Sequence, residues 1–445
     1  MLDGVDQRRM SVDRELSPLT REKLGQFMTP APIARFMASL FAPPSGEIVL
    51  LDPGAGIGML TSAFVEQALL QTGLRSITVH AYEIDPVMRR RLEATLQECH
   101  AFCAQGGIKF RWQIYDEDFI EAGVALVRNE HTLFGAPPQR FTHCIMNPPY
   151  RKINSHSNTR IQLQQIGIET SNLYTGFLAV ASHLLTADGE LVAIVPRSFC
   201  NGVYFRSFRT FFLHEMSFRH IHVFETRDQA FRDNEVLQEN IIIHAVKNQH
   251  RLPVVITSSV RAELDDLTQR EAPYAEVVKP GDSNLFINIA VSKADRLVIE
   301  RLSVFTSTLA ELGVTVSTGP VVDFRLRSDL RQNPTQDTFP LIYPGHLRHH
   351  AVHWPKLDGS KPNAIAASVK TQPWLMPNEW YVLIRRFSAK EEKRRIVASV
   401  YDPGRVPGKM VGFENHLNVL HRKGSGLSPE LARGEIHRHL DLRPP

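Results

Sequence analysis

The sequence has 445 residues, which is more than one hydrophobic core usually organises and suits two or three domains. With 43% hydrophobic and 22% charged residues, its composition is that of a globular protein and excludes a disordered one. No apolar run approaches the ~20 residues of a membrane span, and the N-terminus lacks a signal-peptide apolar region, so we expect a cytosolic protein without membrane contact. Four cysteines argue against a disulfide framework.

The net charge of +4 is unevenly distributed along the chain. Residues 1–250 hold 24 Lys and Arg against 26 Asp and Glu, whereas residues 251–445 hold 27 against 21. The alternation of strand and helix patterns also fades near residue 250. We therefore expect one domain over 1–250 and another over 251–445, and the basic second domain is expected to meet a polyanion.

Residues 46–70 predict a buried strand, a glycine-rich turn and a helix. The strand covers 48–51, and the glycines of "DPGAGIG" permit a tight turn and a close approach of backbone to ligand. Their spacing, G-x-G-x-G, departs from the dinucleotide fingerprint G-x-G-x-x-G. Asp52, at the end of this strand, can accept a hydrogen bond from an amino-acid ammonium group, which NAD lacks. The pattern favours S-adenosylmethionine, with a Rossmann-like dehydrogenase as the alternative.

Two further strands are expected to end at the same ligand-binding edge. Glu83 ends the first of these, 25 residues after Gly58, close to the spacing of ~20 expected for an acid that binds ribose hydroxyls. Residues 108–119 predict the other, which ends in Asp118-Phe119. Repeated strand–helix alternation predicts an α/β fold with a parallel, Rossmann-like sheet and ligands at the carboxyl ends of its strands.

A fourth predicted strand ends in Asn147-Pro148-Pro149-Tyr150, where two prolines prevent its continuation. The fixed φ of proline sets the direction of the Pro148 carbonyl, and the Asn147 side-chain oxygen supplies a second acceptor. Together they can hold both hydrogens of an exocyclic amine and favour a tetrahedral nitrogen. This stabilisation grows as positive charge develops on nitrogen, which is what catalysis requires. The Tyr150 ring offers a surface on which a base can stack.

These motifs resemble those of the amino-methyltransferases that act on adenine N6, and the likeness runs in order over residues 20–250. The segment "KLGQFMTPAPIARFMASLF" (23–41) is similar to the one that precedes the glycine motif in the gamma class of DNA adenine methyltransferases, where Thr29-Pro30 starts a helix with Thr29 as N-cap. The resemblance implies S-adenosylmethionine as cofactor, bound by Phe27, Thr29, Asp52, Gly54, Ala55, Gly56, Gly58, Glu83, Ile84, Asp118, Phe119 and Asn147.

The resemblance also implies base flipping, because an adenine N6 paired inside duplex DNA cannot reach a buried methyl donor. Residues 224–247 resemble the motif whose aromatic residue sandwiches the flipped base. Phe231 is the better match for this ring and Phe224 the alternative. The implied catalytic residues are Asn147, Pro148, Tyr150 and Phe231. Residues 151–171 are either a loop against DNA or an ordinary surface loop.

In its layout the second half resembles the target-recognition domain of gamma-class enzymes, with mixed α+β structure and a helix expected over 388–396. Asn415, His416 and Asn418 are expected to cap a turn rather than read base edges. Five basic residues either contact DNA phosphates or form a solvated face, namely Arg385, Arg386, Lys393, Arg394 and Arg395.

Other classes of protein share part of this motif pattern. Protein glutamine methyltransferases use the same tetrapeptide, but their chains are shorter and lack a large basic domain. An RNA adenine methyltransferase would use identical amine chemistry. A bifunctional restriction enzyme would need a nuclease domain, for which neither end has room, and a non-catalytic specificity subunit would be expected to have lost Asn147 or the glycine turn.

The expected function is site-specific methylation of adenine N6 in double-stranded DNA within a restriction–modification system of the prokaryotic cytoplasm. The resemblance allows for a separate cognate restriction endonuclease as a partner and calls for no metal ion.

Overall fold

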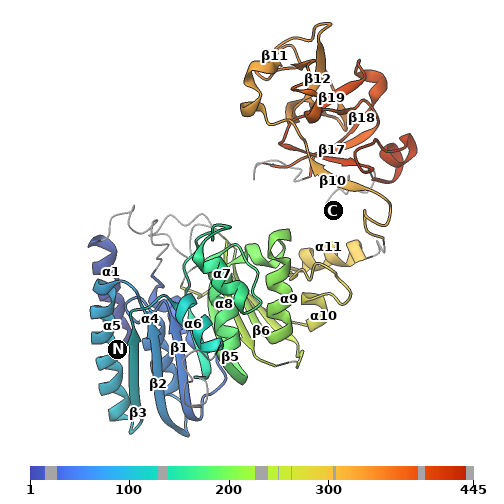
Figure 1. Ribbon diagram of the computed structural model, residues 1–445. Coiled ribbons are helices and arrows are strands. Elements are labelled where there is room, and N and C mark those ends of the chain that lie inside the picture. Colours follow the sequence, from blue (N-terminus) through green and yellow to red (C-terminus); the bar gives the residue numbers. More distant parts are fainter. Residues whose placement is uncertain are drawn as a thin grey trace. The chain divides into compact units, whose positions relative to one another are not determined.

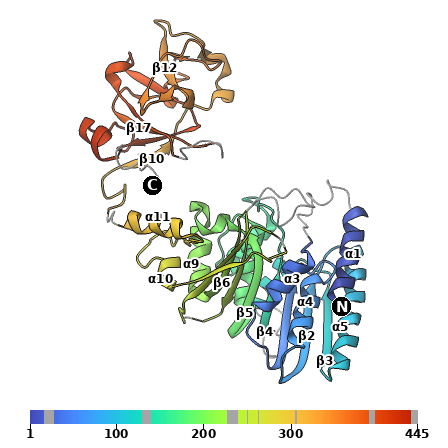
Figure 2. The same cartoon turned by 180° about the vertical axis from the view of Figure 1, so that it is seen from behind.

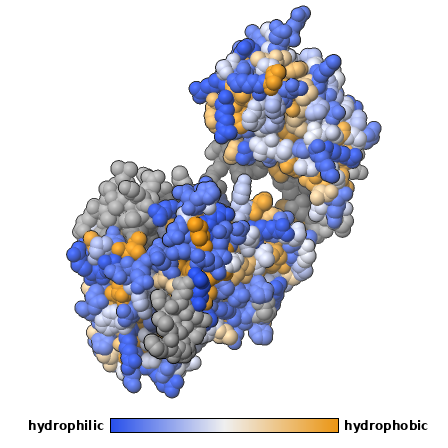
Figure 3. All heavy atoms as spheres, viewed as in Figure 1, coloured by the Kyte–Doolittle hydropathy of each residue, from blue (hydrophilic) through white to orange (hydrophobic). Residues whose placement is uncertain are grey.

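The computed structural model describes residues 1–15, 28–128, 139–225, 239–248, 250–261, 263–303, 307–388 and 396–436. They form two compact units, Met1–Ile299 and Glu300–Pro445 (Figure 1). None of the described helices combines the length and the apolar composition needed to cross a membrane. In Figure 3 the visible surface is mostly hydrophilic, with separate hydrophobic patches.

The first unit is organised around a nine-stranded sheet with the order β3-β2-β1-β4-β5-β7-β6-β8-β9. Strands β1 to β5 are parallel to one another, and β7 is antiparallel to both of its neighbours. The strands are β1 (Gly46–Pro53), β2 (Leu74–Tyr82), β3 (Lys109–Tyr115), β4 (Phe141–Met146), β5 (Leu185–Pro196), β6 (Ser217–Phe224), β7 (Asn240–Val246), β8 (Val254–Ser259) and β9 (Thr268–Ala272).

Helices cover both faces of this sheet, so the unit has three layers (Figures 1 and 2). The core on one face contains residues of α1, α3, α4 and α5, and the core on the other contains residues of α6, α8 and α9. Successive strand residues alternate between the two cores, as Leu50 and Leu51 do. The helices are α1 (Leu2–Glu15), α3 (Ala31–Ser39), α4 (Met59–Ala68), α5 (Pro86–Gln105), α6 (Phe119–Val127), α7 (Asn158–Gln165), α8 (Leu173–Leu184), α9 (Arg206–Glu215), α10 (Tyr274–Val277) and α11 (Lys293–Ser303).

Strands β1 and β4 lie side by side at the point where the strand order reverses. From β1 the chain proceeds through β2 and β3 on one side, whereas β4 and β5 lie on the other. In open α/β sheets, ligands bind at this switch point, outside the carboxyl ends of the strands. The glycine turn follows β1 and Asn147 follows β4, so this α/β fold places both predicted motifs at the same edge.

The boundary predicted at residue 250 is wrong, because the first unit continues to Ile299. Strand β8 pairs in parallel with β6, and β9 pairs antiparallel with β8, so both extend the first sheet. A chain cut at 250 would leave the edge of β6 without its partner. With the boundary at 299, residues 300–445 hold 21 Lys and Arg against 14 Asp and Glu. The second unit therefore remains the basic one.

The second unit is built mainly from two β-sheets joined by short helical turns. Its larger sheet has the order β10-β20-β17-β18-β14-β13 and its smaller sheet the order β11-β15-β12-β19-β16. Tyr381, Tyr401 and Phe413 pack their rings together in its main core. The strands are β10 (Thr315–Thr318), β11 (Leu330–Arg331), β12 (Thr338–Ile342), β13 (Leu347–Arg348), β14 (Ala351–Val352), β15 (Ala364–Ala366), β16 (Met376–Pro377), β17 (Tyr381–Arg385), β18 (Ala398–Tyr401), β19 (Met410–Phe413) and β20 (Leu417–His421).

Candidate functional site

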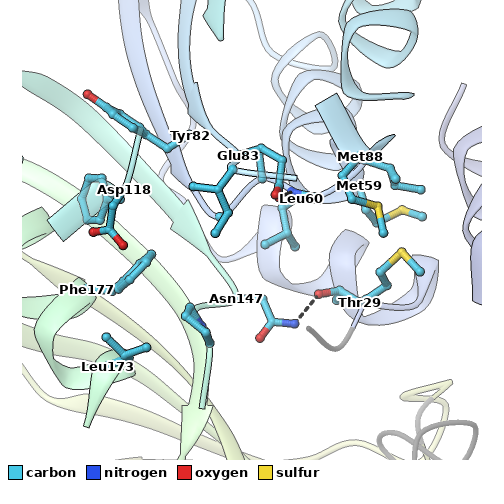
Figure 4. A pocket seen from close by; sticks show the side chains of 18 of the residues that line it. Thr29, Met59, Leu60, Tyr82, Glu83, Met88, Asp118, Asn147, Leu173 and Phe177 are labelled. Carbon is cyan, nitrogen blue, oxygen red and sulfur yellow. Dashed lines mark hydrogen bonds between the residues drawn. The ribbon is translucent and has the colours of Figure 1, made fainter. Parts of the chain in front are cut away.

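A cavity of about 220 Å³ opens at the carboxyl edge of the first sheet (Figure 4). Its walls come from segments that lie far apart in the sequence: the turn after β1, the ends of β2, β3 and β4, and helix α8. Nine residues predicted for the site line it, namely Thr29, Gly54, Ala55, Gly56, Glu83, Ile84, Asp118, Phe119 and Asn147. The structure thus brings most of the predicted site residues together around one cavity.

The glycine turn forms the floor of this cavity through backbone conformations that other residues rarely adopt. Gly56 has a φ of 59°, and a Cβ added to it would meet no atom within 4 Å. Its amide donates a hydrogen bond of 2.9 Å to Glu83 Oε2. Gly58 differs, because it does not line the cavity and caps α4 with a φ of 85°. An added Cβ there would lie 2.9 Å from Leu92 Cδ1 of α5, so Gly58 permits close helix packing.

Two acidic residues of the site are held by backbone amides. Glu83 Oε1 accepts a hydrogen bond of 2.8 Å from the Asp85 amide, which fixes the carboxylate that also binds the glycine turn. Burial raises the pKa of Glu83, while its two backbone hydrogen bonds oppose that shift. Asp118 is the N-cap of α6, and its Oδ1 accepts hydrogen bonds from the amides of Ile120 and Glu121. Both carboxylates are therefore oriented before any ligand binds.

Asp52 lies behind the cavity wall and does not line it. It is fully buried, and its Oδ2 accepts a hydrogen bond of 2.6 Å from the Thr61 hydroxyl. Its Oδ1 is buried without a hydrogen-bond partner among the described residues. Burial raises the pKa of Asp52 to about 7, and the nearby Glu83 carboxylate adds to the shift. Asp52 is thus placed to support the turn, while direct contact with a ligand stays a prediction.

Asn147 projects its carboxamide into the cavity immediately after β4 and is held from two sides. Its Nδ2 donates to Thr29 Oγ1 at 3.1 Å, and its Oδ1 accepts from the Tyr150 hydroxyl at 2.9 Å (Figure 4 shows the first). The expectation that Thr29 caps α3 is wrong, because Pro30 occupies the N-cap position. The Thr29 hydroxyl instead contacts Asn147 across 118 positions of sequence.

The remaining residues of the tetrapeptide differ in their positions relative to the cavity and to Asn147. Pro148 is buried and absent from the cavity wall, whereas Pro149 lines it. The Tyr150 hydroxyl lies 2.9 Å from Asn147 Oδ1 and 3.1 Å from the Ile194 carbonyl oxygen, so its single proton can serve either acceptor. The Tyr150 ring packs edge-on against Tyr174 and does not line the cavity. The structure therefore assigns Tyr150 a positioning contact that sequence reasoning missed, and base stacking stays a prediction.

Sequence reasoning also missed the aromatic wall of the cavity. Tyr82, at the end of β2, meets Phe119 edge-on with ring centroids 5.2 Å apart, and Phe119 lies 5.1 Å from Phe177 of α8. Figure 4 shows Phe177 and Asp118 on one side of the cavity and Met59 and Met88 on the other. Tyr82 directly precedes Glu83 and could have been found from that position. The contribution of α8 carries no signal in the local motifs, because it depends on tertiary packing.

Other predicted residues are either outside the described residues or away from the cavity wall. Phe27, Phe231, Lys393, Arg394 and Arg395 fall outside the described residues, as does most of the helix predicted over 388–396. Phe224, the alternative to Phe231, is buried in the core against His222 and does not line the cavity.

In the second unit, Arg385 donates to the Leu347 carbonyl oxygen, whereas Arg386 is exposed and donates to the Asn415 carbonyl oxygen. His416 Nδ1 lies 2.5 Å from the buried Glu414 carboxylate. The His416 amide bonds the same carboxylate, so Glu414 stabilises the turn that contains Asn415 and His416.

Known proteins resemble this chain over nearly its whole length. Residues 88–231 match the family model described as Eco57I restriction-modification methylase. The chain is 43% identical to type II methyltransferase M.BsuBI of Bacillus subtilis over 447 aligned residues, covering 100% of this chain and 87% of that protein. It is 42% identical to type II methyltransferase M.PstI of Providencia stuartii, covering 97% of this chain and 84% of that protein.

Among solved structures, the type IIG restriction endonuclease BpuSI matches with a TM-score of 0.49 and 12% identity, over 91% of this chain and 54% of that one. Identity above 40% over at least 97% of this chain and 84% of each relative is decisive for the family. The family-model match covers the part of the cavity wall that follows β3 and β4, including Asp118 and Asn147. The chain belongs to the type II methyltransferases of restriction–modification systems.

Proposed function

We propose that this chain transfers a methyl group from S-adenosylmethionine to N6 of an adenine flipped out of duplex DNA. The observation that carries the proposal is the position of the Asn147 carboxamide, which lines the same cavity as the glycine turn, Glu83 and Asp118. A site that joins an amine acceptor to a pocket with fixed carboxylates suits transfer between a charged nucleoside cofactor and an exocyclic amine.

The residues of the cavity fit S-adenosylmethionine in three respects. Gly56 leaves open space where a side chain would project, so a ligand can approach the backbone closely. Glu83 and Asp118 supply oriented acceptors for hydroxyl and amino groups, and the Tyr82–Phe119–Phe177 wall offers apolar contact. When bound, the cofactor would supply an electrophilic methyl group.

The chain's own residues account for activation of the amine. Asn147 Oδ1 accepts one hydrogen of the amine, and the Pro148 carbonyl oxygen accepts the other. An amide oxygen can accept two hydrogen bonds, of which Tyr150 supplies one. Thr29 and Tyr150 hold the carboxamide from both ends, so Asn147 needs little reorganisation as positive charge develops on nitrogen.

The relatives support DNA as the substrate, because they are type II methyltransferases and the matching family is one of restriction-modification methylases. The second unit, with its excess of basic residues, would supply phosphate contacts and read the sequence. Arg386 is the exposed described residue among those predicted to contact phosphate. Phe231 remains our candidate for stacking on the flipped base.

The test is radioactive methyl transfer from S-adenosylmethionine to DNA, RNA and protein in parallel, followed by digestion of the labelled product to nucleosides. We expect label in duplex DNA and recovery of it as N6-methyl-2′-deoxyadenosine. Label in glutamine residues or in RNA would overturn the choice of substrate. Label on cytosine N4 would retain the mechanism and overturn the choice of base.

A further inference from the structure

Two adjacent hydrophobic residues, Val203 and Tyr204, are exposed after β5, at the sheet edge that carries the candidate active site. Val203 is 71% and Tyr204 89% exposed, whereas the next residue, Phe205, is buried. They belong to a short 3-10 helix, Val203–Phe205, that follows β5. Single exposed hydrophobic residues need no explanation, but an adjacent pair at the sheet edge that carries a site is typical of an interaction surface. We call Val203 and Tyr204 the apolar tip.

The apolar tip is held by a buried arginine. Arg209 is 1% exposed, and its Nη1 donates hydrogen bonds of 2.8 Å to the carbonyl oxygens of both Phe199 and Gly202. Its other nitrogens donate to the Asn284 carbonyl oxygen. This one guanidinium fixes the segment just before the tip, so Val203 and Tyr204 project from a defined backbone rather than from a loose loop.

A chain of contacts connects the apolar tip with Asn147. Strands β4 and β5 are parallel neighbours, so the segments that follow them leave the sheet at the same edge. From Asn147 the contacts run through the Tyr150 hydroxyl to the Tyr150 ring, which meets Tyr174 at 6.3 Å between centroids. Tyr174 meets Phe205 at 6.0 Å, and Phe205 directly follows the tip. Two ring contacts therefore separate the tip from the residue that would hold the target amine.

The surroundings of the apolar tip suit a polyanion. Residues 197–209 contain no acidic residue, and Arg209, one of their three arginines, is buried away from the surface. Arg206 is exposed, as are Arg151 and Lys152 after the tetrapeptide. An apolar projection among cations matches the chemistry of duplex DNA, which presents stacked bases between two rows of phosphates.

We propose that Val203 and Tyr204 insert against the base stack beside the target adenine and stabilise the duplex from which it has been flipped. The inference rests on the proposed function. Extruding a base leaves its neighbours unstacked, and apolar side chains placed between base steps compensate for that loss. The need for this compensation is smaller when the target base is already mismatched, because less stacking and pairing is lost.

The experiment uses the full-length chain and the variants Tyr204→Ser, Tyr204→Phe and the double variant Val203→Ser/Tyr204→Ser. The matched control is Leu70→Ser, because Leu70 is 74% exposed and follows α4, at the opposite edge of the sheet. The site methylated by the wild type is first mapped on plasmid DNA. Methyl transfer is then measured on synthetic duplexes in which that adenine faces thymine or mismatched cytosine.

On the paired duplex we expect kcat/KM to fall about 5- to 100-fold for the serine variants, on the scale of one lost stacking contact. On the mismatched duplex the serine variants should recover to within about threefold of the wild type. Tyr204→Phe and Leu70→Ser should match the wild type on both duplexes, and the thermal midpoint should be the same for all variants.

Wild-type rates for the double variant on the paired duplex would overturn the inference, as would an equal loss on both duplexes. A fall in thermal midpoint for Tyr204→Ser would also overturn it, because the tip would then be packed within the protein. If the wild type methylates no DNA at all, the proposed function itself is refuted, an outcome distinct from the other three.

Discussion

Replacing Asn147 with alanine tests the core of the proposed mechanism. The substitution removes the carboxamide that is held between Thr29 at 3.1 Å and Tyr150 at 2.9 Å. It leaves the glycine turn, Glu83 and Asp118 in place around the cavity. We therefore expect methyl transfer to be lost while S-adenosylmethionine still binds within a few-fold of the wild-type affinity, since the lost contact acts mainly in the transition state.

The expected magnitudes follow from these contacts. Each of the two hydrogen bonds contributes about 1 kcal/mol net to folding. Without the carboxamide, Tyr150 can still donate to the Ile194 carbonyl oxygen at 3.1 Å, so its hydroxyl is not left without a partner. The free energy of unfolding should then fall by about 1–2 kcal/mol. The rate should fall much further, because removal of one preorganised group that stabilises developing charge typically costs about 10²–10³ in kcat.

The assay combines single-turnover methyl transfer with calorimetric titration of S-adenosylmethionine, on folded protein verified by its thermal midpoint. Thr29→Val is the matched control, because it removes one partner of Asn147 and keeps the acceptor oxygen. Its kcat should fall by less than that of Asn147→Ala, by about 2- to 10-fold. If cofactor affinity fell as far as the rate in Asn147→Ala, Asn147 would be a cofactor or folding residue and the reasoning would be refuted.

Four further outcomes are expected. Tyr150→Phe should lower kcat about 2- to 10-fold, because it releases the Asn147 carboxamide, and a wild-type kcat for this variant would exclude the positioning role. Tyr150→Ala should additionally weaken binding of 2-aminopurine at the target position if the ring stacks on the base. The fragment 1–299 should bind S-adenosylmethionine but lose specific methylation and most of the salt dependence of DNA affinity, and specific methylation by this fragment would contradict the division of roles between the two units. A fragment ending at 250 should aggregate, because it lacks the strand that pairs with β6. Because the pKa of Asp52 is raised in the folded state, its contribution to the stability of the apo-protein is complete below about pH 4 and is lost as the pH rises to 7. Asp52→Asn should therefore reduce the dependence of the thermal midpoint on pH between pH 5 and 8, and an unchanged dependence would refute the assignment. Gly58→Ala should destabilise the fold by about 1–3 kcal/mol in chemical denaturation, because the added Cβ meets Leu92; a neutral result would show that α4 and α5 can move apart.

The sequence motifs predicted the residues of the candidate site that directly follow the ends of the strands. Gly56, Glu83, Asp118 and Asn147 could each be placed because a parallel sheet gathers the carboxyl ends of its strands at one edge. Their burial and hydrogen bonds could not be placed in the same way. Asp52 belongs to the same motif, yet it lies behind the wall, since side chains along a strand point alternately to opposite faces.

Non-local contacts account for what the sequence did not show. The hydrogen bond between Thr29 and Asn147 and the contribution of Phe177 both join segments far apart in the chain. The same cause explains the wrong boundary, because β8 reads like any isolated strand until its pairing with β6 is known. The sequence predicts a role for the Tyr150 ring, whereas the contact of its hydroxyl with Asn147 becomes visible only in three dimensions.

The burial of the four cysteines has a practical consequence. Cys99, Cys103, Cys144 and Cys200 are all at most 1% exposed and unpaired, and burial raises the pKa of each thiol, to about 11 for Cys103. Thiolate is the reactive form, so the native protein should resist maleimides and mild oxidants. A single cysteine introduced on the surface, for example by Tyr204→Cys, would then be the one site that takes up a fluorophore or spin label. Motion of the apolar tip during a catalytic cycle could be followed without first replacing any native cysteine.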